Sequence, residues 1–220
     1  MVDIGSLTRW RLLALFAVTT AIFLAADHVD QHIGSSVVLA APLDETAHFL
    51  TTLLAIWALG GVADRFLVPA LVASVAIDLD HVPADFGATW ISAGTPRPYT
   101  HSLLTIAGVL LLAVAWRRRR SVLVGVAIGL ALHFWRDLAE PGTGVALLWP
   151  FSNASFSLPH ASYLAGMTVI VIAGLARVFW GRRWQPSATG GESPRLGPEA
   201  HGRADRSSSA GAAVQAGTGV

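Results

Sequence analysis

Six apolar runs separated by short polar stretches constrain most strongly what this chain can fold into. A helix needs about 20 predominantly apolar residues to cross a bilayer, and several of the runs approach that length. Only 13% of the 220 residues are charged, whereas soluble domains carry roughly 25%. We therefore predict an all-α fold, a polytopic transmembrane bundle of about six helices. The runs are Leu12–Ala26, Phe49–Val62, Phe66–Ile77, Leu103–Trp116, Val122–Trp135 and Ala161–Trp180.

Two of these assignments have alternatives. The second and third runs contain Gly60, Gly61 and Pro69, so they could form a re-entrant pair instead of two full spans. The first run follows two arginines and could be a cleaved secretory signal. However, Leu24 occupies the third position back from a cleavage site after Ala26, where a small residue is required. We therefore favour a membrane anchor.

The arginines predict the orientation of the bundle. In a six-helix up-and-down chain, four groups of arginines fall on one side, which the positive-inside rule assigns to the cytoplasm. Both termini are then cytoplasmic, with residues 1–184 as the membrane domain and residues 185–220 as a disordered cytoplasmic tail. The net charge of +1 predicts no binding of nucleic acid. The four groups are Arg9 with Arg11, Arg65, Arg117–Arg120, and Arg182 with Arg183.

The histidines gather on the opposite side. The ends of odd runs and the starts of even runs share one face, and seven of the eight histidines fall there. We expect His48 to open the second helix and Asp78, Asp80 and His81 to close the third. His101 opens the fourth helix, and His133 and Asp137 close the fifth. His28, His32 and His160 lie at the same face, and His201 lies in the tail.

These side chains predict a metal site. His133 and Asp137 are four residues apart, so a helix places them one turn apart on one face. A carboxylate near hydrocarbon is costly unless it is paired or coordinates a metal. The chain has no cysteine, so nitrogen and oxygen ligands would select zinc first, with manganese or iron possible. The expected ligands are His48, Asp78, Asp80, His81, His101, His133 and Asp137.

A structural interpretation competes with this one. The same groups could pair with each other and with Arg97 or Arg136 to stabilise the loops. A second cluster, Asp27, His28, Asp30 and His32, is expected to be a solvated loop, and His160 an ordinary interfacial residue.

Four motifs in order resemble a known family. They are Asp78-Leu79-Asp80-His81, Thr100-His101-Ser102, His133 with Asp137, and Leu147-Leu148-Trp149-Pro150-Phe151. They resemble the YdjM-like membrane-bound, metal-dependent hydrolases of the bacterial inner membrane, which are distantly similar to zinc-dependent phospholipase C and P1-type nucleases. The chain departs from the family at Pro96, where a histidine is common, and at Glu140-Pro141-Gly142, where threonine and glycine are common.

The resemblance implies hydrolysis of a phosphoester by metal-activated water. We expect Asp80 to accept or orient the water proton, and Arg97, or less favourably Arg136, to hold a phosphate oxygen. The location at the membrane surface favours a lipid-derived substrate. The competing classes are a transporter, a b-type haem protein, and a non-enzymatic membrane protein with a structural or vestigial metal site.

Overall fold

The computed structural model describes residues 4–32, 37–142 and 144–180, which form helices and loops with no strand among them. Six α-helices have at least ten residues, and each overlaps one of the six apolar runs, which confirms the all-α bundle. Three stretches are long and apolar enough to cross a membrane: Trp10–Asp30, Ala63–Pro83 and His160–Trp180. The helices are α1 (Ile4–Asp30), α2 (Val37–Leu59), α3 (Leu67–Ala76), α4 (His81–Asp85, a short turn), α5 (Leu103–Ala115), α6 (Arg120–Asp137) and α7 (His160–Trp180).

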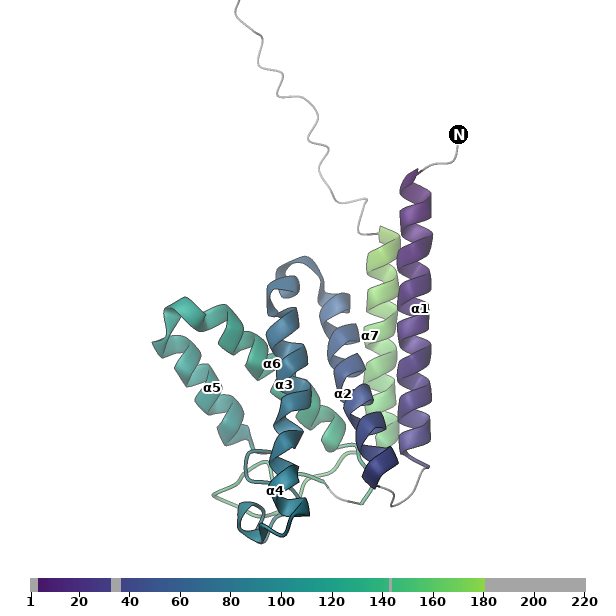
Figure 1. Cartoon of the computed structure of the whole chain (residues 1–220). Helices are drawn as coiled ribbons and strands as arrows, with labels where there is room; N and C mark the ends of the chain where they lie inside the picture. Colours follow the sequence, from purple (N-terminus) through teal and green to yellow (C-terminus); the bar gives the residue numbers. More distant parts are fainter. Residues whose placement is uncertain (1–3, 33–36, 143, 181–220) are drawn as a thin grey trace, which may run out of the picture. The chain divides into compact units, whose positions relative to one another are not determined.

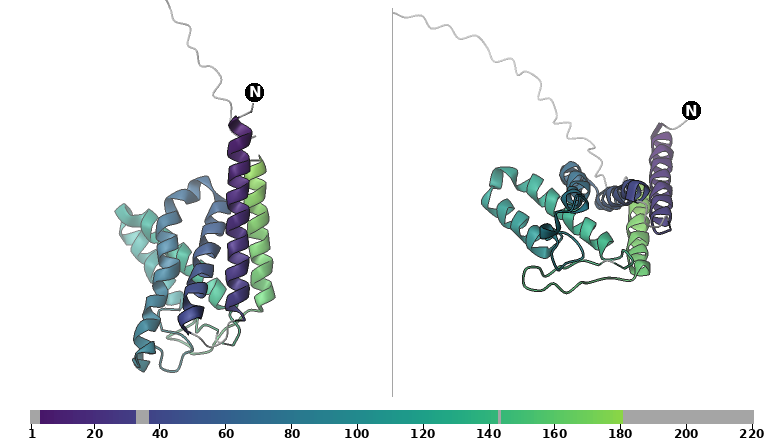
Figure 2. Two further views of the ribbon diagram at one scale, coloured as in Figure 1. Left: turned by 45° about the vertical axis from the view of Figure 1, so that its right-hand side comes forward. Right: turned by 60° about the horizontal axis from the view of Figure 1, so that its bottom comes forward.

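Successive long helices run in alternating directions. The α2–α3 and α5–α6 connections lie at the end of the bundle opposite α4, as Figure 1 and the left view of Figure 2 show. Those two connections carry Arg65 and Arg117–Arg120, which therefore share one end, as predicted. The expected tail at 185–220, with His201, lies outside the described residues, as do Arg182 and Arg183.

Helices α1, α2 and α7 pack together around aromatic side chains. Phe16 of α1 is fully buried, and its ring meets Trp57 of α2 edge-on at 5.0 Å. Phe23 of α1 meets Tyr163 of α7 at 6.2 Å. Exposed apolar side chains, such as Leu111 on α5 and Val169 on α7, cover outer faces of the bundle, which suits contact with lipid.

Helices α3 and α6 approach each other closely because two glycines of α6 face α3. A Cβ atom at Gly129 would lie 2.2 Å from the carbonyl oxygen of Ala70, and one at Gly125 would lie 2.9 Å from that of Phe66. Small residues four apart allow this kind of backbone contact between helices. The spacing continues along α6 to His133 and Asp137, so one face carries both the packing surface and two predicted ligands.

Two helix boundaries differ from the prediction. Helix α2 begins at Val37, about three turns before His48, so the expectation that His48 opens this helix was wrong. Pro42 is the sixth residue of this helix, beyond the first turn in which proline is tolerated without loss, so α2 forgoes one backbone hydrogen bond there. Helix α1 continues through Asp30, so the predicted loop at Asp27 and Asp30 is also helical.

Candidate metal centre

The structure brings all seven predicted ligands together at the end of the bundle that carries α4. Helix α2 supplies His48, the segment after α3 supplies Asp78, Asp80 and His81, and the residue two before α5 is His101. Helix α6 supplies His133 and Asp137. Three overlapping groups could each hold a cation: Asp78, Asp80, His81 and His101; His48, His133 and Asp137; and Asp44, His48 and Asp78.

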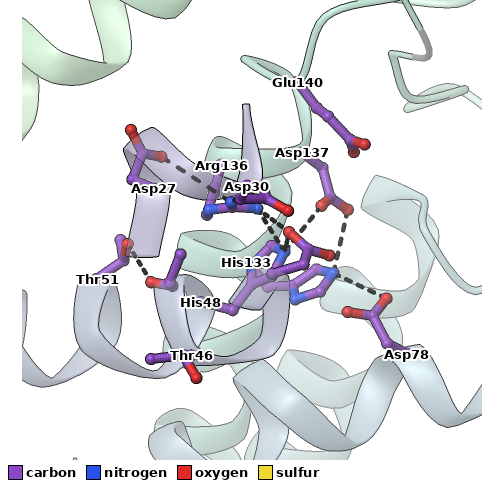
Figure 3. A network of polar contacts seen from close by, with 12 residues as sticks. Asp27, Asp30, Thr46, His48, Thr51, Asp78, His133, Arg136, Asp137 and Glu140 are labelled. Atoms are coloured by element: carbon purple, nitrogen blue, oxygen red, sulfur yellow. Dashed lines mark hydrogen bonds and ion pairs between the residues drawn. The ribbon is translucent and has the colours of Figure 1, made fainter. Parts of the chain in front are cut away.

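Four of these residues form the core of the site, which we call the metal centre: Asp78, His101, His133 and Asp137. The Nε2 atoms of His101 and His133 are 3.2 Å apart. Asp78 Oδ1 lies 3.2 Å from His101 Nε2 and 3.4 Å from His133 Nε2. Asp137 Oδ2 lies 3.6 Å from His101 Nε2 and 3.1 Å from His133 Nε2. Figure 3 shows Asp78 and Asp137 reaching the His133 ring from different elements.

These separations match the spacing of metal ligands. Two ligand atoms 2.0–2.1 Å from a tetrahedral zinc ion lie roughly 3.3–3.4 Å apart. The side chains of His101, His133 and Asp137 are fully buried, and neither oxygen of Asp137 has a hydrogen-bond partner among the described residues. Arg97 Nη1 lies 3.5 Å from Asp137 Oδ1 and offsets part of its charge, and a cation at this point would offset the remaining cost of burying the carboxylate.

The tautomer of His133 supports the same conclusion. His133 Nδ1 lies 2.8 Å from the carbonyl oxygen of Ser74, which can only accept, so Nδ1 carries the hydrogen. The Nε2 lone pair of the neutral ring then faces the carboxylate oxygens of Asp78 and Asp137, which also only accept. These three acceptor atoms can lie this close together only when a cation or a proton sits between them. Histidines that bind a metal commonly donate a hydrogen bond from their other ring nitrogen to a carbonyl oxygen, as His133 does. The donor set therefore fits a divalent metal ion.

Asp80 and His81 lie beside the metal centre on its more exposed side. His81 Nδ1 is 3.1 Å from Asp80 Oδ1 and 3.3 Å from Asp78 Oδ1. Asp80 Oδ2 accepts a hydrogen bond from Thr100 and lies 3.4 Å from His101 Nδ1. Asp80 is thus placed to orient two imidazoles, and the group has the donors for a second ion.

His48 reaches the metal centre from α2. Its ring stacks on that of His133 with centroids 3.8 Å apart, and its Nε2 lies 3.2 Å from Asp137 Oδ1. Sequence reasoning missed Asp44 and Glu45, one turn earlier in α2. Asp44 Oδ1 is 3.5 Å from His48 Nε2. The Asp44–His48 spacing of four residues equals that of His133 and Asp137, so placing the start of α2 correctly would have revealed it.

Arg136 is the centre of an ion network that shares Asp44 and His48 with the candidate cation groups. Its guanidinium pairs with Asp44, lies 2.7 Å from Asp30 Oδ2 and 3.9 Å from Asp27 Oδ1, and donates to His48 Nε2 at 3.3 Å. Asp27 is 4% exposed, so the prediction that Asp27 and Asp30 belong to a solvated loop was wrong. Their helix packs against α2 and α7, and its C-terminal end brings both aspartates to Arg136 of α6, a buried cation that requires anions nearby. These partners occupy Arg136, which leaves it unsuited to hold a phosphate.

Arg97 faces a cavity beside the metal centre. The cavity has a volume of about 410 Å³ and is also lined by Asp78, His81 and Glu45. Arg97 bonds to Glu140, and its Nη1 lies 3.5 Å from Asp137 Oδ1. Glu140 and Pro96, the neighbour of Arg97, both depart from the family motif, and both line this cavity. The two positions at which the chain differs from the family motif therefore line the same cavity.

The comparison with known proteins covers the segment that carries these motifs. The family model of the YdjM inner membrane protein matches residues 27–191. The chain belongs to this family. Apolar helices and YdjM membership together make it a protein of the inner membrane. The YdjM match contains every residue of the metal centre and of the Arg136 network. No curated protein and no solved structure matches the chain.

Proposed function

We propose that this chain is a membrane-bound, metal-dependent hydrolase of phosphoesters. The observation that carries the proposal is the placement of Arg97 on the same cavity as Asp78 and His81. A cation site beside a guanidinium is suited to bind a phosphate. The cation neutralises the negative charge of the phosphate, and the guanidinium donates two parallel hydrogen bonds to its oxygens. A structural ion cluster would not need a cavity at this point.

Asp78, His101, His133 and Asp137 would hold the ion, with His48 and His81 as further ligands. When bound, a divalent cation supplies Lewis acidity, which makes water nucleophilic at neutral pH. Zinc fits a site of imidazoles and carboxylates without thiolates, and manganese or iron remain candidates.

The chain's own residues supply binding and proton transfer. Arg97 releases the carboxylate of Glu140, its ion-pair partner in the structure, and binds a phosphate oxygen of the substrate in its place. Glu45 lines the cavity beside Asp78, so it is placed to exchange a proton with the attacking water or with the leaving group. Asp80, which we also expected in that role, is engaged by Thr100 and His81 and acts instead by orienting His101.

The substrate is proposed to carry an apolar group. Leu79 and Val82 line the same cavity and are 67% and 45% exposed. A polar pocket with an apolar edge suits a phosphoester that is anchored in the membrane. We further propose that the chain crosses the membrane several times with both termini in the cytoplasm, because the arginine-bearing connections share one end. The metal centre then faces the extracytoplasmic side.

Metal content and phosphoesterase activity test the proposal together. Elemental analysis of purified protein should find zinc or another divalent metal in the wild type and a large loss in His133→Ala, with a smaller loss in Asp80→Ala. Activity on para-nitrophenyl phosphate and on phosphatidic acid vesicles should disappear with chelator. Equal trace metal in all three proteins would reject the metal site. Stoichiometric metal without hydrolysis of any phosphoester would favour a structural site.

Arg97→Met tests the phosphate-binding role. We expect KM to rise at least about tenfold, since a hydrogen bond to a charged group contributes roughly 1.5–3 kcal/mol, while metal content stays unchanged. Arg65→Met, at the other end of the bundle, is the matched control and should leave KM unchanged. Glu140→Gln should lower KM severalfold because it releases Arg97 from its internal carboxylate. A KM that is identical in all four proteins would contradict the assignment.

A further inference from the structure

A second cavity lies between α1 and α7, on the other side of the Arg136 network from the metal centre. Its volume is about 680 Å³. Three imidazoles and one carboxylate line it, and none of them belongs to the metal centre. We call it the outer cavity. Its lining residues are Leu24, Asp27, His28, Gln31, His32, His160 and Leu164.

His28 and His32 lie close together at this cavity. They are four residues apart, with His28 in the last turn of α1 and His32 in the turn that follows Asp30, and their ring centroids are 4.4 Å apart. His32 Nδ1 lies 2.7 Å from the carbonyl oxygen of His28, which can only accept, so His32 Nδ1 carries the hydrogen and Nε2 has the lone pair. Both side chains are exposed. Two histidines at this spacing on one helix face are a recurrent zinc-binding arrangement.

His160 at the start of α7 has the same kind of support. Its Nε2 lies 3.1 Å from Asp27 Oδ2, and its Nδ1 is buried with no hydrogen-bond partner among the described residues. A carboxylate that accepts from one ring nitrogen leaves the other free for a metal, as in carboxylate–histidine–metal triads. Two of the three imidazoles of the outer cavity are therefore held in the tautomer that ligation requires.

We propose that the outer cavity binds a second divalent transition-metal ion. His28 and His32 supply two nitrogen ligands, His160 lines the same cavity as the candidate third ligand, and Asp27 orients His160. Imidazole ligands without thiolates select zinc, copper(II) or nickel(II) over magnesium or calcium. Asp27 also lies 3.9 Å from Arg136, so the Arg136 network connects the two sites, which have no ligand in common.

Copper(II) binding, followed by electron paramagnetic resonance, tests the proposal. The protein is the full chain in detergent after removal of any histidine tag. The wild type should bind one more equivalent of copper than His28→Ala/His32→Ala. The lost signal should carry nitrogen hyperfine structure. His160→Ala should weaken that site at least about tenfold. Gln31→Ala, which changes a lining residue that is a poor ligand, should bind as the wild type does.

Equal copper stoichiometry in the wild type and the double variant would overturn the proposal. So would an equal loss of this equivalent in Gln31→Ala. Because His28 and His32 are exposed, their replacement should leave the melting temperature of the metal-free protein within about 2 °C. The test is independent of the proposed hydrolase, because His133→Ala removes the metal centre and should retain the outer equivalent.

Discussion

The metal centre and the outer cavity both use imidazoles and aspartate, but they are built in different ways. The metal centre takes its ligands from separate segments and buries His101, His133 and Asp137 completely. The outer cavity takes two of its histidines from one local segment, the last turn of α1 and the turn that follows it, and both are exposed. Buried acceptors that face one another raise the free energy of the metal-free fold, whereas exposed imidazoles are solvated at little cost. Metal should therefore stabilise the fold far more at the centre than at the outer cavity.

Arg136 lies between the two sites, and replacing it should have the largest effect. Arg136→Met leaves the buried Asp27 and the partly buried Asp30 and Asp44 beside a neutral side chain, which should lower the free energy of unfolding by about 3–5 kcal/mol. Denaturation in detergent, followed by circular dichroism, measures this loss. Arg177→Met, which removes a hydrogen bond to the Trp57 carbonyl, should cost about 1–3 kcal/mol. Equal losses in the two variants would show that the network contributes no special stability.

The close packing of α3 on α6 should matter for the metal centre alone. Gly129→Ala places a Cβ against the Ala70 carbonyl oxygen, which should cost about 1–3 kcal/mol and move His133 away from Ser74. Metal affinity at the centre should fall about 10–100-fold, as for lost second-shell contacts. Gly108→Ala in α5 is the matched control because its Cβ would have nothing within 4 Å.

The comparison would fail if Gly129→Ala weakened copper binding at the outer cavity as much as metal binding at the centre. That result would mean that the two sites respond to the packing of the whole bundle and not to their own ligands.

We expect the smallest change in the free energy of unfolding from a substitution at Tyr163. Its hydroxyl hydrogen-bonds to Thr51 Oγ1 at 2.6 Å, and its ring lies 5.7 Å from that of His160. Tyr163→Phe should lower the free energy of unfolding by about 1 kcal/mol and leave metal at the centre unchanged. Thr168→Val, whose hydroxyl bonds only within α7, is the control. A loss of metal from the centre in Tyr163→Phe would contradict the separation of the two sites.

The sequence predicted the helices and one common face for the ligands because both follow from hydrophobic periodicity. Seven histidines at the ends of alternating runs could be placed on one side without knowing any helix contact. The prediction that His133 and Asp137 lie one turn apart on one helix face is likewise confirmed, since it depends only on the geometry of a single helix.

The sequence could not predict which charges pair across the bundle. Arg97 and Arg136 are both arginines near the predicted site, and only the packing of α1, α2 and α6 decides that Arg136 meets three aspartates. Glu45 was missed because Phe49 appeared to start the second helix, although the helix begins at Val37. A carboxylate inside a helix can be tolerated by tertiary partners that local patterns do not reveal.

The order in which the ligands are synthesised has a consequence for biogenesis. His48 and Asp78 leave the ribosome before α6, so α2 and the apolar stretch Ala63–Pro83, which is long enough to cross a membrane, are made while their polar side chains lack His133, Arg136 and Asp137. Ionisable groups without partners in a bilayer are costly, which favours holding these helices at the insertion machinery until α6 arrives. Any cation held by all four ligands of the metal centre can be captured only after Asp137 has been made.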